Sequence, residues 1–366
     1  MQTVVGLMSG TSMDGIDAAL VRTDGELRAE PLAFVTIPYE DGFRSALRSC
    51  LGGKGPVEAV ERALTDAHAD AVRRLLAEAG VTADAVDLIG FHGHTIFHAP
   101  DQRRTWQIGD GARLATATGI PVVNDFRTAD VQAGGQGAPL VPLFHRALAE
   151  TLPRPLAVLN IGGVANVTWI GRKGIGRGED AVIACDTGPG NALVDDWVLN
   201  RQGLRYDAGG ALAQAGRVDA AALAALLSHP YFDQPAPKSL DRDAFDPSPV
   251  LDLSAEDGAA TLTAFTAAAV ARVVPHLPEP PVQWLVCGGG RHNVTLMGML
   301  AERLGVPVAP VEQVGWNGDA LEAEAFAYLA VRSRKGLPLS MPATTGVPQP
   351  MTGGRFHPVG HDAGDV

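Results

Sequence analysis

The feature that most constrains the fold is an order of predicted elements that occurs twice along the chain. In the first half, apolar strands at 4–8 and 16–22 flank a turn of small residues, and a third strand follows at 32–39. The second half has a strand, turn and strand over 156–170 and a third strand at 181–186. Each half continues with a helix, a buried strand that enters a loop, a second helix and a last strand, at 57–80, 86–95, 111–119 and 120–125 and again at 259–274, 282–293, 296–305 and 306–311. This repeat predicts a duplicated α/β domain.

We expect two domains that face each other across a central cleft. A chain of 366 residues has the length of about two domains. We place the N-terminal domain at residues 1–128, with the C-terminal tail as a candidate addition to it, and the C-terminal domain at 129–349. The equivalent turns, at 9–17 and 161–166, would then approach one ligand from both sides. Both turns are rich in glycine, which lets backbone N–H groups come close to an anion.

Charge and composition argue against several classes of protein. The formal net charge of −12 argues against nucleic acid or an anionic membrane surface as a partner. The three cysteines are far apart and odd in number, which is typical of free thiols in a reducing cytosol. No basic residue precedes Arg22, so we expect no signal peptide, and we find no run of roughly 18 apolar residues that would span a membrane. These features predict a cytoplasmic protein.

The loop in GLMSGTSMDGIDAAL combines glycines, hydroxyls and two carboxylates. Small residues with accessible N–H and hydroxyl groups suit phosphate oxygens, and Asp14 and Asp17 could hold Mg²⁺. The alternative is a polar hairpin with a type I′ turn at Asp14–Gly15. The sequence has no GxxxxGK[ST] motif and no GxGxxG after a strand, so a P-loop and a Rossmann site are not expected.

Two segments of the second half carry further candidate site residues. In CDTGPGNALVDDW, Asp186 ends a predicted strand before a Gly-Pro-Gly turn, where it would serve as a general base or as a structural carboxylate. In VCGGGRHN, three glycines follow a buried strand and precede a helix. Their small size would admit an anion at the helix N-terminus, or would serve tight packing between helix and strand.

Three polar segments remain open between functional and structural roles. FHGHTIFH has the His-x-His spacing of some metal sites, but imidazoles bonded to the backbone or to a sugar are the favoured interpretation. In NDFRTADVQAGGQGAPLVP, Arg127 could pair with a substrate carboxylate, although the segment could also be an interdomain linker. Glu322 and Glu324 lie two apart on a predicted helix, so they cannot share a face, and one of them could point into the cleft.

Taken in order, eight segments resemble the anhydro-N-acetylmuramic acid kinase family, a branch of the actin/hexokinase/Hsp70 ATPase superfamily. The resemblance runs from residue 6 to about residue 340. The segments are GLMSGTSMDGIDAAL, GFHGHTIFH, NDFRTADVQAGGQGAPLVP, LNIGGVANVTWI, DTGPGNALVDDW, HPYFDQPAPKSLDRDAF, CGGGRHN and DALEAEAFAYLA.

The resemblance implies two actin-like ATPase domains of the ribonuclease H-like fold around a central cleft. It implies a reaction in which ATP and water convert 1,6-anhydro-N-acetylmuramic acid to N-acetylmuramic acid 6-phosphate and ADP, in peptidoglycan recycling and amino-sugar catabolism. Asp186 would be the catalytic base, Glu322 would assist, and Thr95 and Arg127 would bind the sugar. Asp14 and Asp17 would hold Mg²⁺. The residues expected to bind ATP are Gly10, Thr11, Ser12, Met13, Asp14, Gly15, Ile16, Asp17, Gly162, Gly163, Asn166, Gly288, Gly289 and Gly290. A cytoplasmic homodimer is expected.

Three other functions remain as alternatives. An ordinary sugar kinase of the same superfamily would use Asp186 to activate an existing hydroxyl, without the hydrolytic step. A non-catalytic nucleotide switch would leave Asp186 and the polar segment 124–142 without a purpose. A metal hydrolase would depend on the three histidines of FHGHTIFH.

Overall fold

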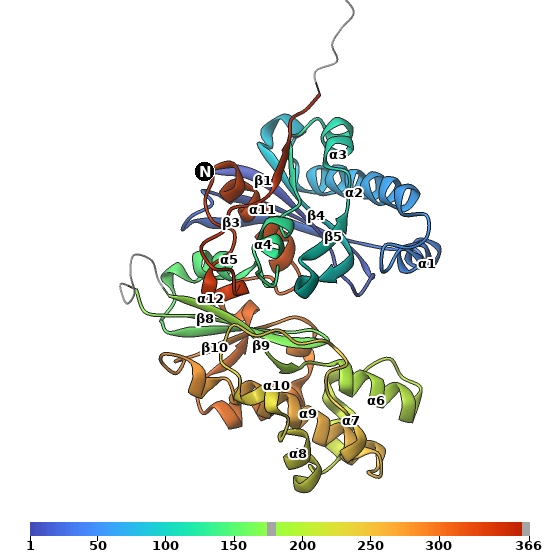
Figure 1. Cartoon of the computed structure of the whole chain (residues 1–366), viewed down its shortest axis with the longest axis vertical. Coiled ribbons are helices and arrows are strands. Elements are labelled where there is room, and N and C mark those ends of the chain that lie inside the picture. Colours follow the sequence, from blue (N-terminus) through green and yellow to red (C-terminus); the bar gives the residue numbers. More distant parts are fainter. Residues whose placement is uncertain (174–180, 361–366) are drawn as a thin grey trace, which may run out of the picture. The chain divides into compact units, whose positions relative to one another are not determined.

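The computed structural model describes residues 1–173 and 181–360, and the chain divides into two compact units. The first unit contains Met1–Thr151 and Asp319–Val366, and the second contains Leu152–Gly318. These bounds differ from the predicted domains, 1–128 and 129–349. The difference arises because helix α5 (Pro142–Leu148) contacts strand β3 and helix α11 (Leu321–Arg334) packs on β1, β2 and β4, all in the first unit. Figure 1 shows the elements along the chain.

The first unit is built on a mixed sheet of seven strands. β1 (Gln2–Ser9) and β2 (Gly15–Thr23) form the first hairpin, and β3 (Ala29–Pro38) pairs antiparallel with β2. On the other side of β1 lie β4 (Leu88–Ala99) and then β6 (Val122–Asn124), both parallel to it. β5 (Arg104–Ile108) pairs with β4, and the C-terminal β12 (Arg355–His357) pairs with β6.

The second unit repeats this topology in five strands. β7 (Leu156–Ile161), β8 (Val164–Ile170) and β9 (Val182–Pro189) are antiparallel neighbours. β10 (Trp284–Cys287) is parallel to β7, and β11 (Val308–Pro310) is parallel to β10. The shared order β3-β2-β1-β4-β6 and β9-β8-β7-β10-β11, with the same strand directions, confirms the predicted duplication. It is the strand order of the ribonuclease H-like fold of actin-like ATPases.

Helices cover the two sheets, and several end where glycine predicts. α2 (Val57–Ala79), α3 (Gly111–Thr118) and α10 (Val294–Leu304) each end at a glycine in the left-handed region, with φ of 65°, 70° and 66°. Glycine adopts this conformation without the steric cost that other residues meet. The remaining α-helices of the described chain are α1 (Asp41–Ser49), α4 (Thr128–Gln132), α6 (Ala192–Gln202), α7 (Ala211–Ala215), α8 (Ala220–Leu226), α9 (Ala255–Ala271) and α12 (Pro342–Thr345).

Helix α11 lies very close to the first sheet because two strand glycines face it. A methyl group on Gly6 of β1 would lie 1.8 Å from the Ala323 carbonyl oxygen, and one on Gly90 of β4 would lie 2.0 Å from the Phe326 carbonyl oxygen. No side chain fits in that space. This close contact ties residues from the end of the chain to strands from its beginning.

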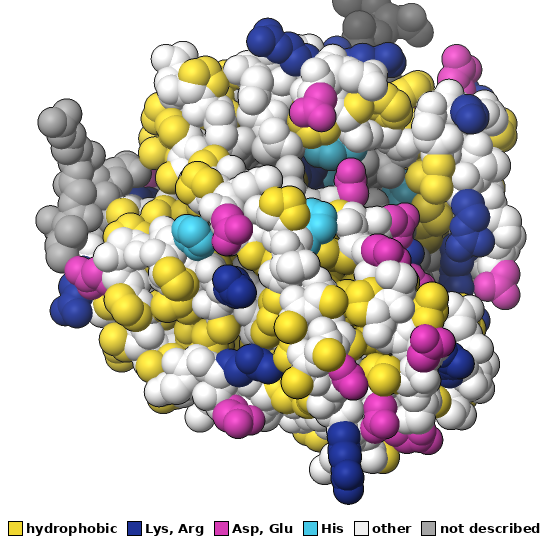
Figure 2. Space-filling view, turned by 60° about the horizontal axis from the view of Figure 1, so that its bottom comes forward, with side chains coloured by type: hydrophobic (Ala, Val, Ile, Leu, Met, Phe, Trp, Pro, Cys, Tyr) yellow, Lys and Arg dark blue, Asp and Glu magenta, His cyan; other side chains and the backbone are white. Residues whose placement is uncertain are grey.

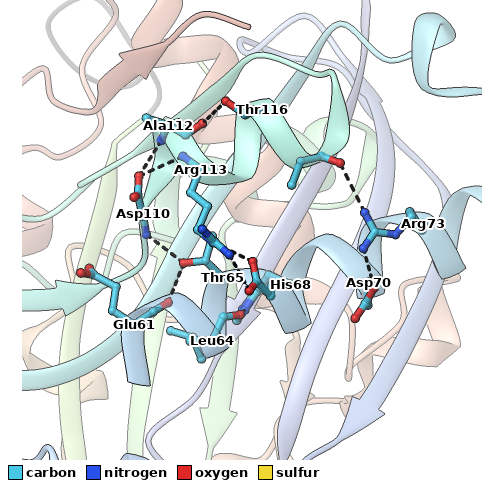
Figure 3. A network of polar contacts seen from close by, with 12 residues as sticks. Glu61, Leu64, Thr65, His68, Asp70, Arg73, Asp110, Ala112, Arg113 and Thr116 are labelled. Carbon is cyan, nitrogen blue, oxygen red and sulfur yellow. Dashed lines mark hydrogen bonds and ion pairs between the residues drawn. The ribbon is translucent and has the colours of Figure 1, made fainter. Parts of the chain in front are cut away.

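A polar network joins α2 to the start of α3 (Figure 3). The Asp110 side chain caps α3 by accepting from the N–H groups of Ala112 and Arg113, both at 3.0 Å. The Asp110 N–H donates to the Thr65 hydroxyl, which donates to the Glu61 carbonyl on α2. Capping satisfies backbone donors that a helix N-terminus otherwise leaves free, so this network fixes the turn between β5 and α3.

The sequence analysis found no segment that could span a membrane, but the segment that contains helix α9 is long and apolar enough to do so. By length and composition alone, Ala255–His276 would suffice to cross a membrane, but 78% of its most apolar window is buried within the protein. The core helix of a globular unit has the same composition, because it is apolar on every face.

On the face drawn in Figure 2, acidic and basic side chains of the described residues are interspersed and form no single basic patch.

Candidate functional site

In the first unit, the predicted phosphate loop is a tight turn between β1 and β2. The Met13 N–H donates to the Gly10 carbonyl at 3.0 Å, and Met13 is left-handed with φ of 57°. Neither Asp14 nor Gly15 has a positive φ, so the alternative type I′ turn at Asp14–Gly15 is excluded. Thr11, Ser12 and Asp14 are exposed, whereas Met13, Gly15 and Ile16 are buried beneath them. The polar side chains of the loop therefore lie at the surface.

A buried hydrogen-bonded chain supports the base of this loop. The Tyr39 hydroxyl donates to Ser9 Oγ at 2.8 Å, and Ser9 Oγ contacts His94 Nδ1 at 2.9 Å. Burial lowers the pKa of His94 to about 4, so its imidazole is neutral at physiological pH. Ser9 ends β1 and His94 lies on β4, so the chain fixes the start of the loop to the neighbouring strand.

Burial and neighbouring carboxylates raise the pKa values of Asp17 and Glu322. Burial raises the pKa of Asp17 to about 6, against the Thr36 hydroxyl that donates to it at 2.6 Å, and the Asp14 and Asp319 carboxylates raise it further. Partial loss of water around its carboxyl raises the pKa of Glu322, which keeps an exposed surface. Arg127 lowers that pKa, and Asp17 and Asp14 raise it. Asp14, Asp17, Glu322 and Arg127 thus share one electrostatic environment.

The carboxylates of Asp14 and Asp17 fit a divalent cation whose other ligands come from a bound substrate and from water. Among residues 1–173 and 181–360, no three His, Cys, Asp or Glu side chains gather closely enough to hold a metal ion. Mg²⁺ is typically bound through one or two carboxylates plus substrate phosphates and water, not in an all-protein cage. Asp14 and Asp17 would supply the carboxylate oxygens of such a site.

Arg127 lies half-buried between two fixed acceptors. Its Nε donates to His92 Nε2 at 2.9 Å and its Nη1 to the Gly137 carbonyl at 2.6 Å. His92 Nδ1 donates to the Gly93 carbonyl at 2.9 Å, so His92 is a neutral imidazole with its proton on Nδ1. Burial lowers the pKa of Arg127 to about 10, against the Glu322 and Asp130 carboxylates, which leaves it cationic at neutral pH.

Thr95 and His98 of β4 each form a side-chain hydrogen bond to β5. The Thr95 hydroxyl accepts from Gln107 Nε2 at 3.2 Å, which orients it on β4. His98 Nδ1 contacts the Thr105 hydroxyl at 3.0 Å. Each histidine of FHGHTIFH therefore has a protein partner, but only His92 bonds to the backbone as predicted, since His94 and His98 bond to hydroxyl side chains. The metal hydrolase alternative loses its basis among the described residues.

In the second unit, Asp186 is held by backbone groups and by one tyrosine. Its N–H donates to the Lys238 carbonyl at 2.9 Å, and the Tyr231 hydroxyl donates to its carbonyl at 2.7 Å. Among the described residues, its carboxylate accepts one hydrogen bond, from the Leu240 N–H to Oδ2 at 2.8 Å, and none reaches Oδ1. Burial raises the pKa of Asp186 to about 7, against the lowering by Leu240 N–H. A carboxylate with one anchored oxygen and a pKa near neutrality is suited to general base catalysis.

The predicted glycine loops of the second unit gather at the same edge of its sheet. The N–H groups of Gly190 and Asn191 donate to the carbonyls of Gly163 and Gly162, at 2.9 and 2.7 Å. A methyl group on Gly288 (φ 73°) would lie 2.4 Å from Asn160 Oδ1, and one on Gly290 would lie 2.4 Å from Ile161 Cγ2.

Gly289 is exposed above these packed neighbours, and Asn166 pairs with Asp186 across β8 and β9. The loops after β7, β9 and β10 thus line one glycine-rich edge beside Asp186. Glu322 lies in the first unit and Asp186 in the second, so the two predicted catalytic carboxylates belong to different compact units.

Sequence reasoning missed the residues that hold the predicted ones in place. Tyr231 and Leu240 anchor Asp186 from a segment more than 40 residues away, and Asp130 and His92 hold the surroundings of Arg127. The segment HPYFDQPAPKSLD was noted only for its resemblance, and nothing in its spacing indicates which strand it contacts.

Comparison with known proteins decides the family. A profile described as anhydro-N-acetylmuramic acid kinase matches residues 2–359. The chain belongs to the anhydro-N-acetylmuramic acid kinase family. Among curated members, it is 58% identical over 359 residues to one from Rhodospirillum rubrum, covering 97% of this chain and 94% of that protein. It is 60% identical over 356 residues to one from Paramagnetospirillum magneticum, covering 96% and 99%.

The fold also aligns with solved sugar kinases. One is a ROK family glucokinase from Streptomyces griseus, in complex with glucose and AMPPNP, with a TM-score of 0.40 and 14% identity over 90% of this chain and 99% of that chain. Family membership rests on the profile and the curated relatives. The chain is accordingly an enzyme of the anhydro-N-acetylmuramic acid kinase family.

Proposed function

We propose that this enzyme opens the 1,6-anhydro bond of 1,6-anhydro-N-acetylmuramic acid with water and transfers the γ-phosphoryl group of ATP to O6. The products are N-acetylmuramic acid 6-phosphate and ADP. Family membership supports the substrate and the kinase activity. The observation that carries the mechanism is Asp186, whose pKa is raised to about 7 and whose Oδ2 is anchored by Leu240, while Oδ1 accepts no hydrogen bond from the part of the chain that the structure describes.

In this mechanism Asp186 is the general base of a coupled reaction. A water molecule attacks the anomeric carbon, and its proton passes to Asp186. The bond between that carbon and O6 breaks, and O6 attacks the γ-phosphorus as ADP leaves. The raised pKa leaves a sizeable fraction of Asp186 ionised at neutral pH and makes it a stronger proton acceptor than an ordinary carboxylate.

The glycine loops of both units would hold ATP. In the first unit, half-buried Gly10 and the exposed Thr11 and Ser12 would contact phosphate oxygens, with Asp14 and Asp17 holding Mg²⁺. When bound, the cation would neutralise phosphate charge during transfer. In the second unit, the edge formed by Gly162–Gly163 and Gly288–Gly290 would admit the rest of the nucleotide, since it lacks side chains that would obstruct it.

Arg127 would bind the lactyl carboxylate of the sugar, with Thr95 donating to or accepting from a sugar oxygen. Glu322 would assist from the same environment as Arg127. We further propose a cytoplasmic homodimer that acts in peptidoglycan recycling. The three cysteines, Cys50, Cys185 and Cys287, are buried thiols, which supports a reducing compartment.

The test is to incubate the purified enzyme with ATP, Mg²⁺ and either the anhydro sugar or open N-acetylmuramic acid, and to identify products by mass spectrometry. The proposal expects ADP and a 6-phosphate from the anhydro sugar. Phosphorylation of the open sugar alone would support the ordinary sugar kinase and would overturn the hydrolytic step.

A further inference from the structure

We propose that Asp130 is a positioning residue for recognition of the acidic sugar, and that the C-terminal segment Ser340–Thr345 acts through it to orient Arg127. This inference rests on the proposed function, because it assumes that Arg127 binds the sugar carboxylate. All the residues concerned lie in the first unit.

Asp130 is a buried carboxylate whose partners come from two distant parts of the chain. Only 2% of its surface is exposed. Its Oδ1 accepts from the Gly137 N–H at 2.6 Å, and its Oδ2 accepts from the Thr345 hydroxyl at 2.6 Å and from the Ser340 hydroxyl. Three hydrogen bonds therefore hold a charge whose burial would otherwise be costly.

The backbone of Gly137 links Asp130 to Arg127. Its N–H donates to Asp130 and its carbonyl accepts from Arg127 Nη1, so the position of the carboxylate sets the position of the acceptor. The preceding residue is held as well, because the Gln136 N–H donates to the Thr345 carbonyl at 2.7 Å. Thr345 thus fixes the glycine loop twice, once through its backbone and once through Asp130.

Space around the loop is equally restricted. A methyl group on Gly135 would lie 2.2 Å from Asp130 Oδ1 and 2.4 Å from Val347 Cγ1. Gly137 is left-handed, with φ of 68°, and a methyl group there would lie 2.5 Å from Val131 Cγ2. The loop therefore has one close-packed arrangement against the C-terminal segment, and Arg127 takes its acceptor from that arrangement.

This arrangement selects which donors Arg127 presents. Of its five N–H groups, one on Nε is used by His92 and one on Nη1 by Gly137. The second Nη1 hydrogen and the Nη2 hydrogens have no partner among the described residues. These hydrogens include donors with which a guanidinium can bind a carboxylate in a bidentate fork. Fixing Nε and Nη1 fixes the direction of that fork, and a small rotation would misalign it.

The experiment compares two sugars by calorimetric titration. One is 1,6-anhydro-N-acetylmuramic acid, and the other is 1,6-anhydro-N-acetylglucosamine, which lacks the lactyl carboxylate. The central variants are Thr345→Val, which removes the hydroxyl, and Thr345→Ser, which keeps it. Ser340→Ala is a second route to the same loss. Ser333→Ala is the matched control, because its hydroxyl donates to Gly353 in the C-terminal tail and not to Asp130.

We expect Thr345→Val and Ser340→Ala to weaken binding of the acidic sugar roughly tenfold, as loss of a hydrogen bond to a charged group does, with the neutral sugar little changed. Thr345→Ser and Ser333→Ala should bind both sugars as the unmodified enzyme does. Asp130→Asn should lose more than either single hydroxyl variant.

Other outcomes overturn the inference in distinguishable ways. Equal loss of both sugars in Thr345→Val, or no loss of either, would make Asp130 structural only, while the proposed function stands. If the unmodified enzyme binds neither sugar, the proposed function fails first. Melting temperatures identify a variant that fails to fold, and in that case the second hydroxyl variant gives the result.

Discussion

At the scale of single residues, Asp186 is the proposed general base, and the burial of its carboxyl also lowers the stability of the fold at neutral pH. Its place in a strand before Gly-Pro-Gly was predicted, but the predicted strand ended at Asp186, whereas β9 continues to Pro189 because Gly188 and Pro189 still pair with β8. Its pKa was not predictable, because burial depends on Tyr231 and the segment around Leu240, which the fold brings to β9.

The first prediction concerns the pH dependence of turnover. Asp186 must be ionised to accept a proton, so kcat/KM should fall about tenfold per pH unit below a pKa of about 7. Asp186→Asn should reduce turnover by about 10²–10⁴-fold and remove this limb. Asp195→Asn is the control, because burial also raises the pKa of that carboxyl, to about 6, and it lies in the first turn of α6 and is not among the proposed catalytic residues. Loss of the low-pH limb in Asp195→Asn would show that the limb belongs to Asp195 and would contradict its assignment to Asp186.

The second prediction concerns stability. The folded pKa of Asp186 is about 7, above the value of about 3.9 expected when unfolded, so the folded protein binds more protons between pH 4 and 7. Stability therefore falls as pH rises through this window. Asp186→Asn should lose this dependence and gain about 4 kcal/mol over the unmodified protein between pH 4 and pH 8 in urea titrations. A stability difference that does not change with pH would contradict the assigned pKa.

At the scale of elements, local pattern predicted most strands and the long helices, and missed what depends on distant partners. Apolar runs gave β1, β4 and β7, and a glycine stop gave the end of α2. The edge strand β12 and the short helix α12 were missed, because three or four residues carry no periodicity. The role of Asp130 was missed, because its partners Ser340 and Thr345 lie 210 and 215 residues away along the chain.

The third prediction tests the contact between α11 and the first sheet. Gly6→Ala and Gly90→Ala should each destabilise the protein by about 3 kcal/mol or more, because the added methyl group meets backbone oxygen that α11 cannot move easily. Gly298→Ala is the control, because it lies within α10 with open space around it and should stabilise by about 0.5–1 kcal/mol. Urea titrations measure all three. A small effect at Gly6 would mean that α11 is not docked as described.

At the scale of the whole molecule, duplication was the strongest inference from sequence. The two sheets share their strand order and directions, although the two sequences have few identical residues at matching positions. The bounds of the units were not predictable to the same degree, since α11 follows the second unit in sequence but packs on the first. Local composition gives no signal for such a return.

The central claim is that one active site couples hydrolysis to phosphorylation through Asp186. The most direct test is mass spectrometry of the product formed from the anhydro sugar, ATP and Mg²⁺ in H₂¹⁸O. The label is read early and against an unlabelled-product control, since a free anomeric hydroxyl exchanges with water. We predict a product that carries one phosphate and one ¹⁸O at the anomeric carbon, absent with Asp186→Asn and retained with Asp195→Asn. Turnover without solvent oxygen at that carbon, or full activity of Asp186→Asn, would contradict the account.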